Sequence, residues 1–248
     1  MGLCRIYSPQ ALAAGMELAL APAACRHLTL VLRLREGAPL VLFNGNGRDY
    51  PAFLIETSKG HCTVRVEQEG EPEPPIPLEI SLALGISKGE RMDFAMQKAV
   101  ELGVARIIPI LTERSTPQQN PERQQRKLAH WQNIIISACE QCGRRRLPEL
   151  MAPQTIESLL RQVDDQQLSL LLHPDGAGSL ADLDRPPVGA KILLLIGSEG
   201  GLSPTEIAGA QTAGFQAIRL GPRVLRTETA PLATIAAIQA LWGDFRDS

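Results

Sequence analysis

The sequence lacks the basic excess that is common in proteins whose whole surface meets nucleic acid. Its 25 lysines and arginines stand against 27 aspartates and glutamates, which leaves a formal net charge of −2. Any surface for a phosphate-rich partner must therefore be local. The segment 114–146 holds seven basic and two acidic residues, a local charge of +5. A solvated helix face followed by a loop would explain this segment equally well. Its basic residues are Arg114, Arg123, Arg126, Lys127, Arg144, Arg145 and Arg146.

Long apolar runs and regular cysteine patterns are also missing. Runs such as Ile192–Ile196 fall far short of the ~20 residues that cross a bilayer, so we expect no membrane segment. The Ala-rich stretch 11–24 is interrupted by Glu17 and Pro22, unlike a signal peptide. Five cysteines without regular spacing indicate reduced thiols in a cytoplasmic protein. Cys139-Glu-Gln-Cys142 has no second cysteine pair nearby, so we expect two core cysteines and no metal.

The motifs of several enzyme classes are absent. No G-x-x-x-x-G-K-[ST] segment exists, which excludes a P-loop, and Gly45-Asn-Gly47 lacks the third glycine of a dinucleotide-binding turn. The four histidines show no triad or HExxH spacing, and Ser198 has no G-x-S-x-G surroundings, so hydrolases are disfavoured. The Gly-rich first loop of Rossmann-type methyltransferases is missing as well.

A proline-rich and glutamate-rich stretch, 69–77, predicts a linker, because four prolines in nine residues suit neither helix nor central strand. We therefore expect a first domain over 1–70, a linker over 71–77 and a second domain over 78–248. The first domain shows several short strands, including a hairpin pattern around Asn44–Gly47 and an alternating run at 62–67, which favours a small β-barrel.

The second domain alternates strands and helices, which predicts an α/β fold with a mostly parallel sheet covered by helices on both faces. Met92, Ala95, Met96 and Ala99 lie at helical spacing, and Ser203-Pro-Thr-Glu206 has the pattern of a capping box. The expected strands are 82–86, 106–111, 168–172, 192–196 and 217–220. A further helix is expected to begin at Asn120-Pro121. The apolar stripe of this helix consists of Leu128, Trp131, Ile135, Ala138 and Cys142.

Three of these strands end in loops that could bind a ligand, because ligands of open α/β sheets lie beyond the carboxyl ends of the strands. Glycines in the second loop would let main-chain groups approach a ligand closely, although a glycine pair before a helix is more often a plain turn. The three loops are Leu172–Gly176, Ile196–Leu202 and Leu220–Thr229.

Taken together, the loops resemble a known family. Gly197-Ser-Glu-Gly-Gly-Leu-Ser203 and Leu220-Gly-Pro-Arg-Val-Leu-Arg-Thr-Glu-Thr-Ala230 are similar to motifs of the SPOUT methyltransferases of the RsmE type. Further similarity lies in Lys88–Phe94, Gln97–Gly103 and Ala138–Arg144, and it extends over essentially the whole chain. The second loop of the family more often reads Gly-Pro-Glu-Gly-Gly, so Ser198 is a departure.

The resemblance implies an enzyme that uses S-adenosylmethionine to methylate N3 of a uridine, position 1498, in 16S ribosomal RNA of the small ribosomal subunit. It also implies a trefoil-knotted SPOUT sheet, a PUA-like RNA-binding barrel, a homodimer and no metal. The cofactor would contact Leu172, His173, Pro174, Gly197, Glu199, Gly200, Gly201, Leu220, Gly221, Leu225, Arg226, Thr227 and Thr229. Arg144 falls where the family places a functional arginine near the target base.

Because the cofactor already activates the methyl group, the protein has to align the two reactants and stabilise the charge that develops on the base. Arg144 could stabilise the anion that forms on the base. Glu199 could accept the N3 proton or hold main-chain amides, and both roles stay open. The alternatives to the 16S activity are a SPOUT enzyme for another rRNA site or tRNA ribose, and a non-catalytic ribosome-assembly factor. The C-terminal helix, whose apolar residues include Ala233, Ile235, Ala236, Ile238, Leu241 and Trp242, favours pairing with a second subunit.

Overall fold

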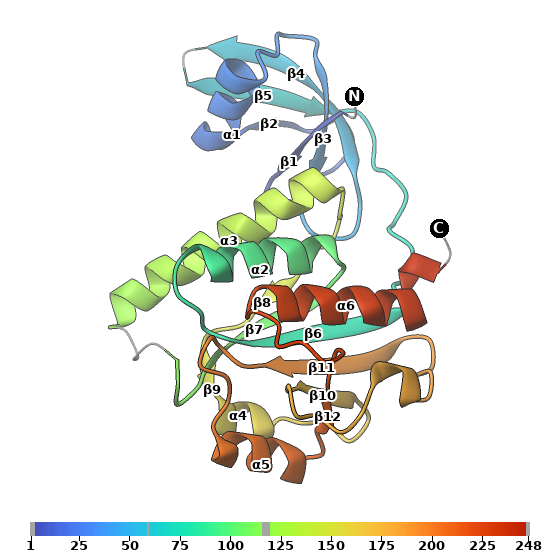
Figure 1. Ribbon diagram of the computed structural model, residues 1–248. Coiled ribbons are helices and arrows are strands. Elements are labelled where there is room, and N and C mark those ends of the chain that lie inside the picture. Colours follow the sequence, from blue (N-terminus) through green and yellow to red (C-terminus); the bar gives the residue numbers. More distant parts are fainter. Residues whose placement is uncertain (1–2, 59, 116–119, 247–248) are drawn as a thin grey trace. The chain divides into compact units, whose positions relative to one another are not determined.

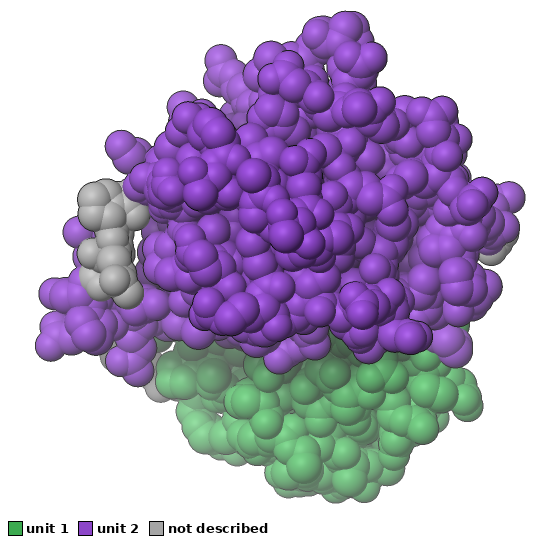
Figure 2. All heavy atoms as spheres, turned by 90° about the horizontal axis from the view of Figure 1, so that it is seen from below, with its two compact units in different colours: residues 1–74, 136–147 green, residues 75–135, 148–248 purple. Residues whose placement is uncertain are grey.

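The computed structural model describes residues 3–58, 60–115 and 120–246 (Figure 1). Its contacts divide the chain into two compact units, shown in separate colours in Figure 2. Unit 1 consists of Met1–Pro74 with Ile136–Leu147, and unit 2 of Pro75–Ile135 with Pro148–Ser248. Unit 1 therefore includes the end of a helix that the sequence-based division gave to the second domain. In the described part of the chain, no helix is both long and apolar enough to span a membrane.

Five strands build the sheet of unit 1, in the order β1-β3-β4-β5-β2. β1 and β3 run parallel, and the other neighbours run antiparallel. Alternate side chains of β5 are buried, as its sequence predicts, and Leu28 of the π-helical turn His27–Val31 packs into the same core. The strands are β1 (Cys4–Tyr7), β2 (Glu17–Ala19), β3 (Pro39–Phe43), β4 (Tyr50–Ser58) and β5 (His61–Val66), with helix α1 at Pro22–Arg26.

The predicted hairpin of β3 and β4 is confirmed, and residues 44–49, which include the predicted turn residues Asn44–Gly47, connect the two strands. Asn46 closes this loop by donating from its side chain to the Tyr50 hydroxyl over 2.7 Å. The proline-rich segment is bound to the same loop, since the Glu73 N–H donates to the Gly47 carbonyl over 2.7 Å. The segment is thus neither helix nor sheet strand, yet it is held by main-chain hydrogen bonds.

The expectation that all cysteines are reduced is wrong for one pair. Cys25 on α1 and Cys62 on β5 form a disulfide, with their Cα atoms 5.4 Å apart. Both residues belong to the buried core of unit 1. They are separated by 37 positions, and only the packing of α1 against β5 brings them together. Spacing along the sequence carries no signal for such a pair.

Unit 2 is built on a parallel sheet in the order β12-β10-β11-β6-β7-β8, with β9 also paired to β7, as the sequence predicts. Its strands are β6 (Leu78–Gly85), β7 (Arg106–Leu111), β8 (Glu149–Leu150), β9 (Gln154–Thr155), β10 (Leu168–Leu172), β11 (Ala190–Ile196) and β12 (Gln216–Ile218). Its helices are α2 (Glu90–Glu101), α3 (Pro121–Cys142, shared with unit 1), α4 (Ile156–Leu160), α5 (Pro204–Thr212) and α6 (Thr229–Trp242), besides the 3₁₀ turns Leu180–Asp182 and Asp244–Arg246.

Helices cover both faces of this sheet (Figure 1). Alternate residues of the central strands, such as Leu193 and Leu195 of β11, pack with Ile156 of α4 and Ala210 of α5 in one core cluster. The residues between them, such as Leu194, are equally buried on the face covered by α2 and α6. Because both faces of a central strand such as β11 are covered, its sequence is a continuous apolar run rather than an alternating one.

The predicted helix signals are confirmed at their starts. Ser203 and Glu206 form the full capping box of α5, with side-chain hydrogen bonds in both directions. The Asn120 side chain accepts the Arg123 N–H over 2.9 Å at the start of α3. One position of the predicted α3 stripe is wrong, because Cys142 is exposed and Cys139 is buried instead. The trefoil knot implied by the resemblance stays a prediction.

Candidate active site

A cavity of about 560 Å³ lies at the carboxyl ends of three neighbouring strands of unit 2. β12, β10 and β11 are adjacent and parallel, so the loops that follow them emerge at one edge of the sheet. Residues from all three loops line the cavity, together with Arg91 of α2 and Arg114 beyond β7. Its volume lies within the range of ~300–1,000 Å³ that is usual for small-molecule sites.

Glycines allow the backbones of these loops to meet without side chains between them. A Cβ added to Gly197 would lie 2.8 Å from the carbonyl carbon of Gly201, and one added to Gly85 would overlap the backbone nitrogen of Ser198. Gly201 has a φ of +69°, which other residues rarely adopt. Gly197 is therefore needed because the backbone of Gly201 lies so close to it, whereas Gly201 is needed because the chain turns there with a positive φ.

Hydrogen bonds fix the second and third loops against their neighbours. The Thr227 hydroxyl donates to the Gly197 carbonyl over 3.2 Å, and its oxygen also lies 3.2 Å from the Ser87 hydroxyl. The Arg114 guanidinium donates to the Gly200 carbonyl over 3.0 Å. These bonds join loops from β6, β7, β11 and β12 and hold the walls of the cavity together.

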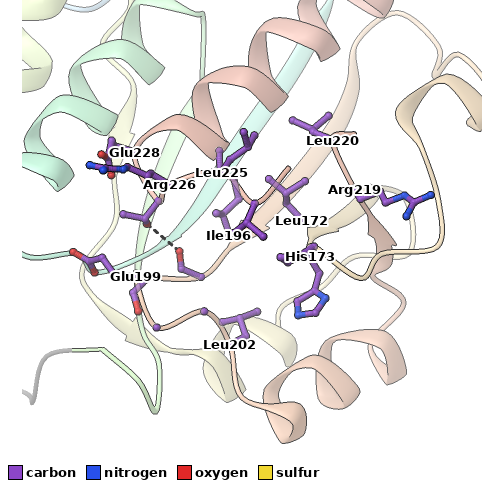
Figure 3. A pocket seen from close by; sticks show the side chains of 18 of the residues that line it. Leu172, His173, Ile196, Glu199, Leu202, Arg219, Leu220, Leu225, Arg226 and Glu228 are labelled. Carbon is purple, nitrogen blue, oxygen red and sulfur yellow. Dashed lines mark hydrogen bonds between the residues drawn. The ribbon is translucent and has the colours of Figure 1, made fainter. Parts of the chain in front are cut away.

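The lining of the cavity divides into apolar and charged parts. Figure 3 shows Leu172, Ile196 and Leu225 gathered in the middle of the cavity, with His173 on one side and Glu199 on the other. The apolar part suits a flat base such as adenine, which the surrounding main chain could read by hydrogen bonds. The ionisable residues of the lining are Arg91, Arg114, His173, Glu199, Arg219, Arg223, Arg226 and Glu228.

Glu199 is held as an ionised acceptor. Its Oε1 accepts the Lys88 main-chain N–H over 3.1 Å and the Arg91 guanidinium over 3.2 Å. Burial raises the pKa of Glu199, but hydrogen bonds from its own amide, the Lys88 amide and Arg91, together with the charge of Arg91, outweigh burial and lower it overall. A carboxylate with a lowered pKa and engaged lone pairs is a weak proton acceptor. The geometry favours the structural role of the two that the sequence leaves open.

The cavity brings together twelve of the thirteen residues that the resemblance assigns to cofactor binding. The exception is Thr229, which begins α6 and does not line the cavity. Arg144 lies after the end of α3 in unit 1 and is not among the lining residues. Lining residues that the sequence did not single out include Arg91, Arg219, Arg223 and Glu228. Glu228 could have been predicted from the sequence, because it lies between Arg226 and Thr229, two residues that the resemblance assigns to the cofactor.

The basic residues of segment 114–146 lie in different parts of the structure. Arg114 lines the cavity, while Arg123, Arg126 and Lys127 lie on the first turns of α3. Burial, with a smaller effect of Arg123, lowers the pKa of Lys127, whose ammonium lies 4.8 Å from the centre of the Trp131 ring.

In unit 1, acidic residues from outside the segment offset two of its arginines. Arg145 pairs with Asp49 over 3.2 Å, and Arg146 lies 3.8 Å from Glu73. The carbonyl of Arg144 accepts a hydrogen bond from Arg5 over 3.1 Å, which holds the backbone of this arginine against β1. The local charge of +5 counted along the sequence therefore overstates the charge that this end of the segment presents.

A family model described as "RNA methyltransferase domain" matches residues 74–239, and one described as "RNA methyltransferase PUA domain" matches residues 23–67. The fold and the match define the class: the chain belongs to the RNA methyltransferase family. Its relatives are of the RsmE type, as the motifs predict. The chain is 34% identical over 240 residues to "Ribosomal RNA small subunit methyltransferase E" of Buchnera aphidicola subsp. Schizaphis graminum, with 97% of each chain covered.

Two solved structures are similar over the whole chain. Ribosomal RNA small subunit methyltransferase E from Neisseria gonorrhoeae, bound to S-adenosyl methionine, shares 40% identity at a TM-score of 0.90 and covers 98% of this chain and 100% of its own. A Legionella pneumophila protein in complex with the bound cofactor SAM shares 42% identity at a TM-score of 0.92, again with 98% and 100% covered. Both relatives bind the methyl donor that the motifs of this chain imply.

Proposed function

We propose that this chain transfers the methyl group of S-adenosylmethionine to N3 of a uridine, position 1498, in 16S rRNA of the small ribosomal subunit. The observation that carries the proposal is the cavity at the ends of β10, β11 and β12, whose lining includes twelve of the thirteen residues that the resemblance assigns to cofactor binding. The matching of the chain to RNA methyltransferases and their PUA domain supports the same reaction class.

The residues of the cavity fit the cofactor. The apolar side chains of Leu172, Ile196 and Leu225 would contact the adenine, and the glycine loop would let main-chain groups reach the nucleoside. When bound, S-adenosylmethionine supplies an activated methyl group. The chain itself would hold the two reactants in line and stabilise the charge that develops on the base.

Arg144 is proposed to hydrogen-bond a carbonyl oxygen of the target base or a neighbouring phosphate as the N3 anion forms. Glu199 is proposed to fix the glycine loop through Lys88 and Arg91 rather than to move a proton. The basic residues Arg114, Arg123, Arg126, Lys127, Arg144, Arg145 and Arg146 are proposed to meet the RNA backbone together with unit 1, and the enzyme is proposed to work as a homodimer.

One experiment tests the reaction and its target together. The purified protein is incubated with S-adenosylmethionine and either small subunits or free 16S rRNA from a strain that lacks this modification, and the nucleosides are then analysed by mass spectrometry. We expect 3-methyluridine in the 16S rRNA. Methyl groups on ribose or in added tRNA would favour the other SPOUT activities, and no methylation in the presence of bound cofactor would favour an assembly factor.

A further inference from the structure

The cavity is more positively charged than the chain as a whole. The described residues that line it include five arginines and two glutamates, a net charge of +3 with His173 neutral, whereas the whole chain has a formal net charge of −2. S-adenosylmethionine carries a carboxylate, an ammonium group and a sulfonium group, so it is itself a cation. The arginines therefore exceed what the cofactor needs, and their surplus charge favours an anion that binds beside it.

Three of the five arginines already have a partner or an expected role. Arg91 pairs with Glu199 over 3.2 Å, and Arg114 donates to the Gly200 carbonyl over 3.0 Å. The resemblance assigns Arg226 to the cofactor, whose carboxylate needs a cation. The surplus positive charge therefore lies on the other two arginines of the lining, Arg219 and Arg223.

Arg219 and Arg223 lie on the loop that follows β12, and both are exposed to solvent. Within the part of the chain that the structure describes, neither guanidinium forms an ion pair or a hydrogen bond. Figure 3 shows Arg219 on the side of His173, with its guanidinium turned away from the apolar middle of the cavity. Both residues still line the cavity, so their charges lie at its rim, in water.

The rim is where a nucleotide substrate would keep its phosphates. Methyl transfer requires the accepting atom within ~3–3.5 Å of the methyl carbon, so the target base has to enter the cavity. The phosphates on either side of that nucleotide are charged and hydrated, and they stay at the rim. The guanidinium fork of an arginine matches two oxygens of a phosphate, and it is weakly hydrated compared with an ammonium group.

We propose that Arg219 and Arg223 bind the phosphates that flank the target uridine, an inference that rests on the proposed function. The two arginines hold the nucleotide at the rim while its base reaches the methyl donor. The phosphates in turn neutralise positive charge next to the cationic cofactor. This places an RNA contact on the loop after β12, outside the basic segment 114–146.

The test measures the binding of a 16S rRNA fragment that contains uridine 1498 at several salt concentrations. Arg219→Gln and Arg223→Gln should each weaken RNA binding by ~10-fold, the effect of one charged hydrogen bond. Each should also reduce by about one the slope of log affinity against log salt concentration, and the double variant should show both losses.

Arg185→Gln is the matched control. It removes the same charge from an exposed arginine of unit 2 that does not line the cavity, so RNA affinity and salt slope should stay those of the wild type. The double variant with lysine at positions 219 and 223 keeps both charges and should keep the salt slope. Thermal melting checks that all variants are folded.

The affinity for S-adenosylmethionine separates a phosphate contact from a cofactor contact. The glutamine variants should bind the cofactor at least as well as the wild type, because they remove charge of the cofactor's own sign. Calorimetric titration measures this affinity without RNA. A tenfold loss of cofactor affinity would overturn the proposal, because the arginines would then hold the cofactor's carboxylate.

An unchanged salt slope in the double glutamine variant would also overturn the proposal. These measurements concern binding and do not depend on turnover. If the wild-type protein binds the fragment but forms no 3-methyluridine in 16S rRNA, the proposed function fails instead, and the two failures are thus told apart.

Discussion

Gly197→Ala is the smallest change that tests the close packing of the glycine loop. The added Cβ would lie 2.8 Å from the carbonyl carbon of Gly201 and 3.0 Å from its Cα and from the nitrogen of Leu202. All three are backbone atoms, so no side chain can rotate to make room. Overpacking of this kind costs ~1–3 kcal/mol. The strain is relieved when the turn closed by the Gly201 N–H and the Ser198 carbonyl, 2.8 Å apart, opens.

Cofactor binding should suffer because the bound state requires the closed turn. If the full strain opposes binding, the dissociation constant for S-adenosylmethionine rises about 5-fold to 150-fold, since ~1.4 kcal/mol corresponds to a factor of ten. Calorimetric titration measures this change, and thermal melting reports the stability of the same samples.

Gly189→Ala provides the matched control. Gly189 lies in the turn before β11 with a φ of +80°, and an added Cβ would meet no atom within 4 Å. An alanine there costs ~1–2 kcal/mol of backbone strain without reaching the cavity, so melting should shift while cofactor affinity stays that of the wild type. Unchanged cofactor affinity in a folded Gly197→Ala protein would refute the role given to this loop.

The remaining predictions concern charge, RNA and assembly. Arg144→Ala should lower kcat by ~100-fold with cofactor affinity nearly unchanged. Wild-type turnover in this variant would mean that Arg144 has no part in catalysis and is only a surface charge. Because the pKa of Glu199 is lowered in the folded protein, the ionised carboxylate stabilises the fold at every pH above the ordinary glutamate pKa of ~4.3. This stabilisation is lost as the pH falls through the lower pKa of the folded state. The difference in melting temperature between wild type and Glu199→Gln should therefore disappear in acid. RNA affinity should fall steeply with added salt while cofactor affinity does not, and a flat RNA response would argue against phosphate contacts. Light scattering should give twice the chain mass of 26.9 kDa, whereas an active monomer at micromolar concentration would contradict the homodimer.

The sequence predicts those parts of the fold that depend on local patterns. The capping box at Ser203 and Glu206 and the helix start at Asn120 involve residues only three positions apart. The apolar strands are predicted equally well, because burial on both faces leaves continuous runs such as Ile192–Ile196. The three ligand loops follow from the rule that such strands share one edge.

Features that depend on distant contacts were not predictable in this way. The Cys25–Cys62 disulfide requires α1 to pack on β5, and the ion pairs of Arg145 and Arg146 require acidic residues about 70 to 100 positions away along the chain. The same holds for Glu199, whose partners are Lys88, just before α2, and Arg91, in the first turn of that helix. Their charges could be counted in the sequence, but only the fold decides which of them meet.

The most direct test of the account is a map of the methylated position. Methylation at N3 blocks the base-pairing edge of uridine, so reverse transcriptase should stop there. After incubation of unmodified small subunits with the protein and S-adenosylmethionine, we predict one new stop, at the nucleotide directly 3′ of uridine 1498 of 16S rRNA, and none when the cofactor is omitted. A stop elsewhere, or methyl incorporation that produces no stop, would contradict N3 methylation of this uridine.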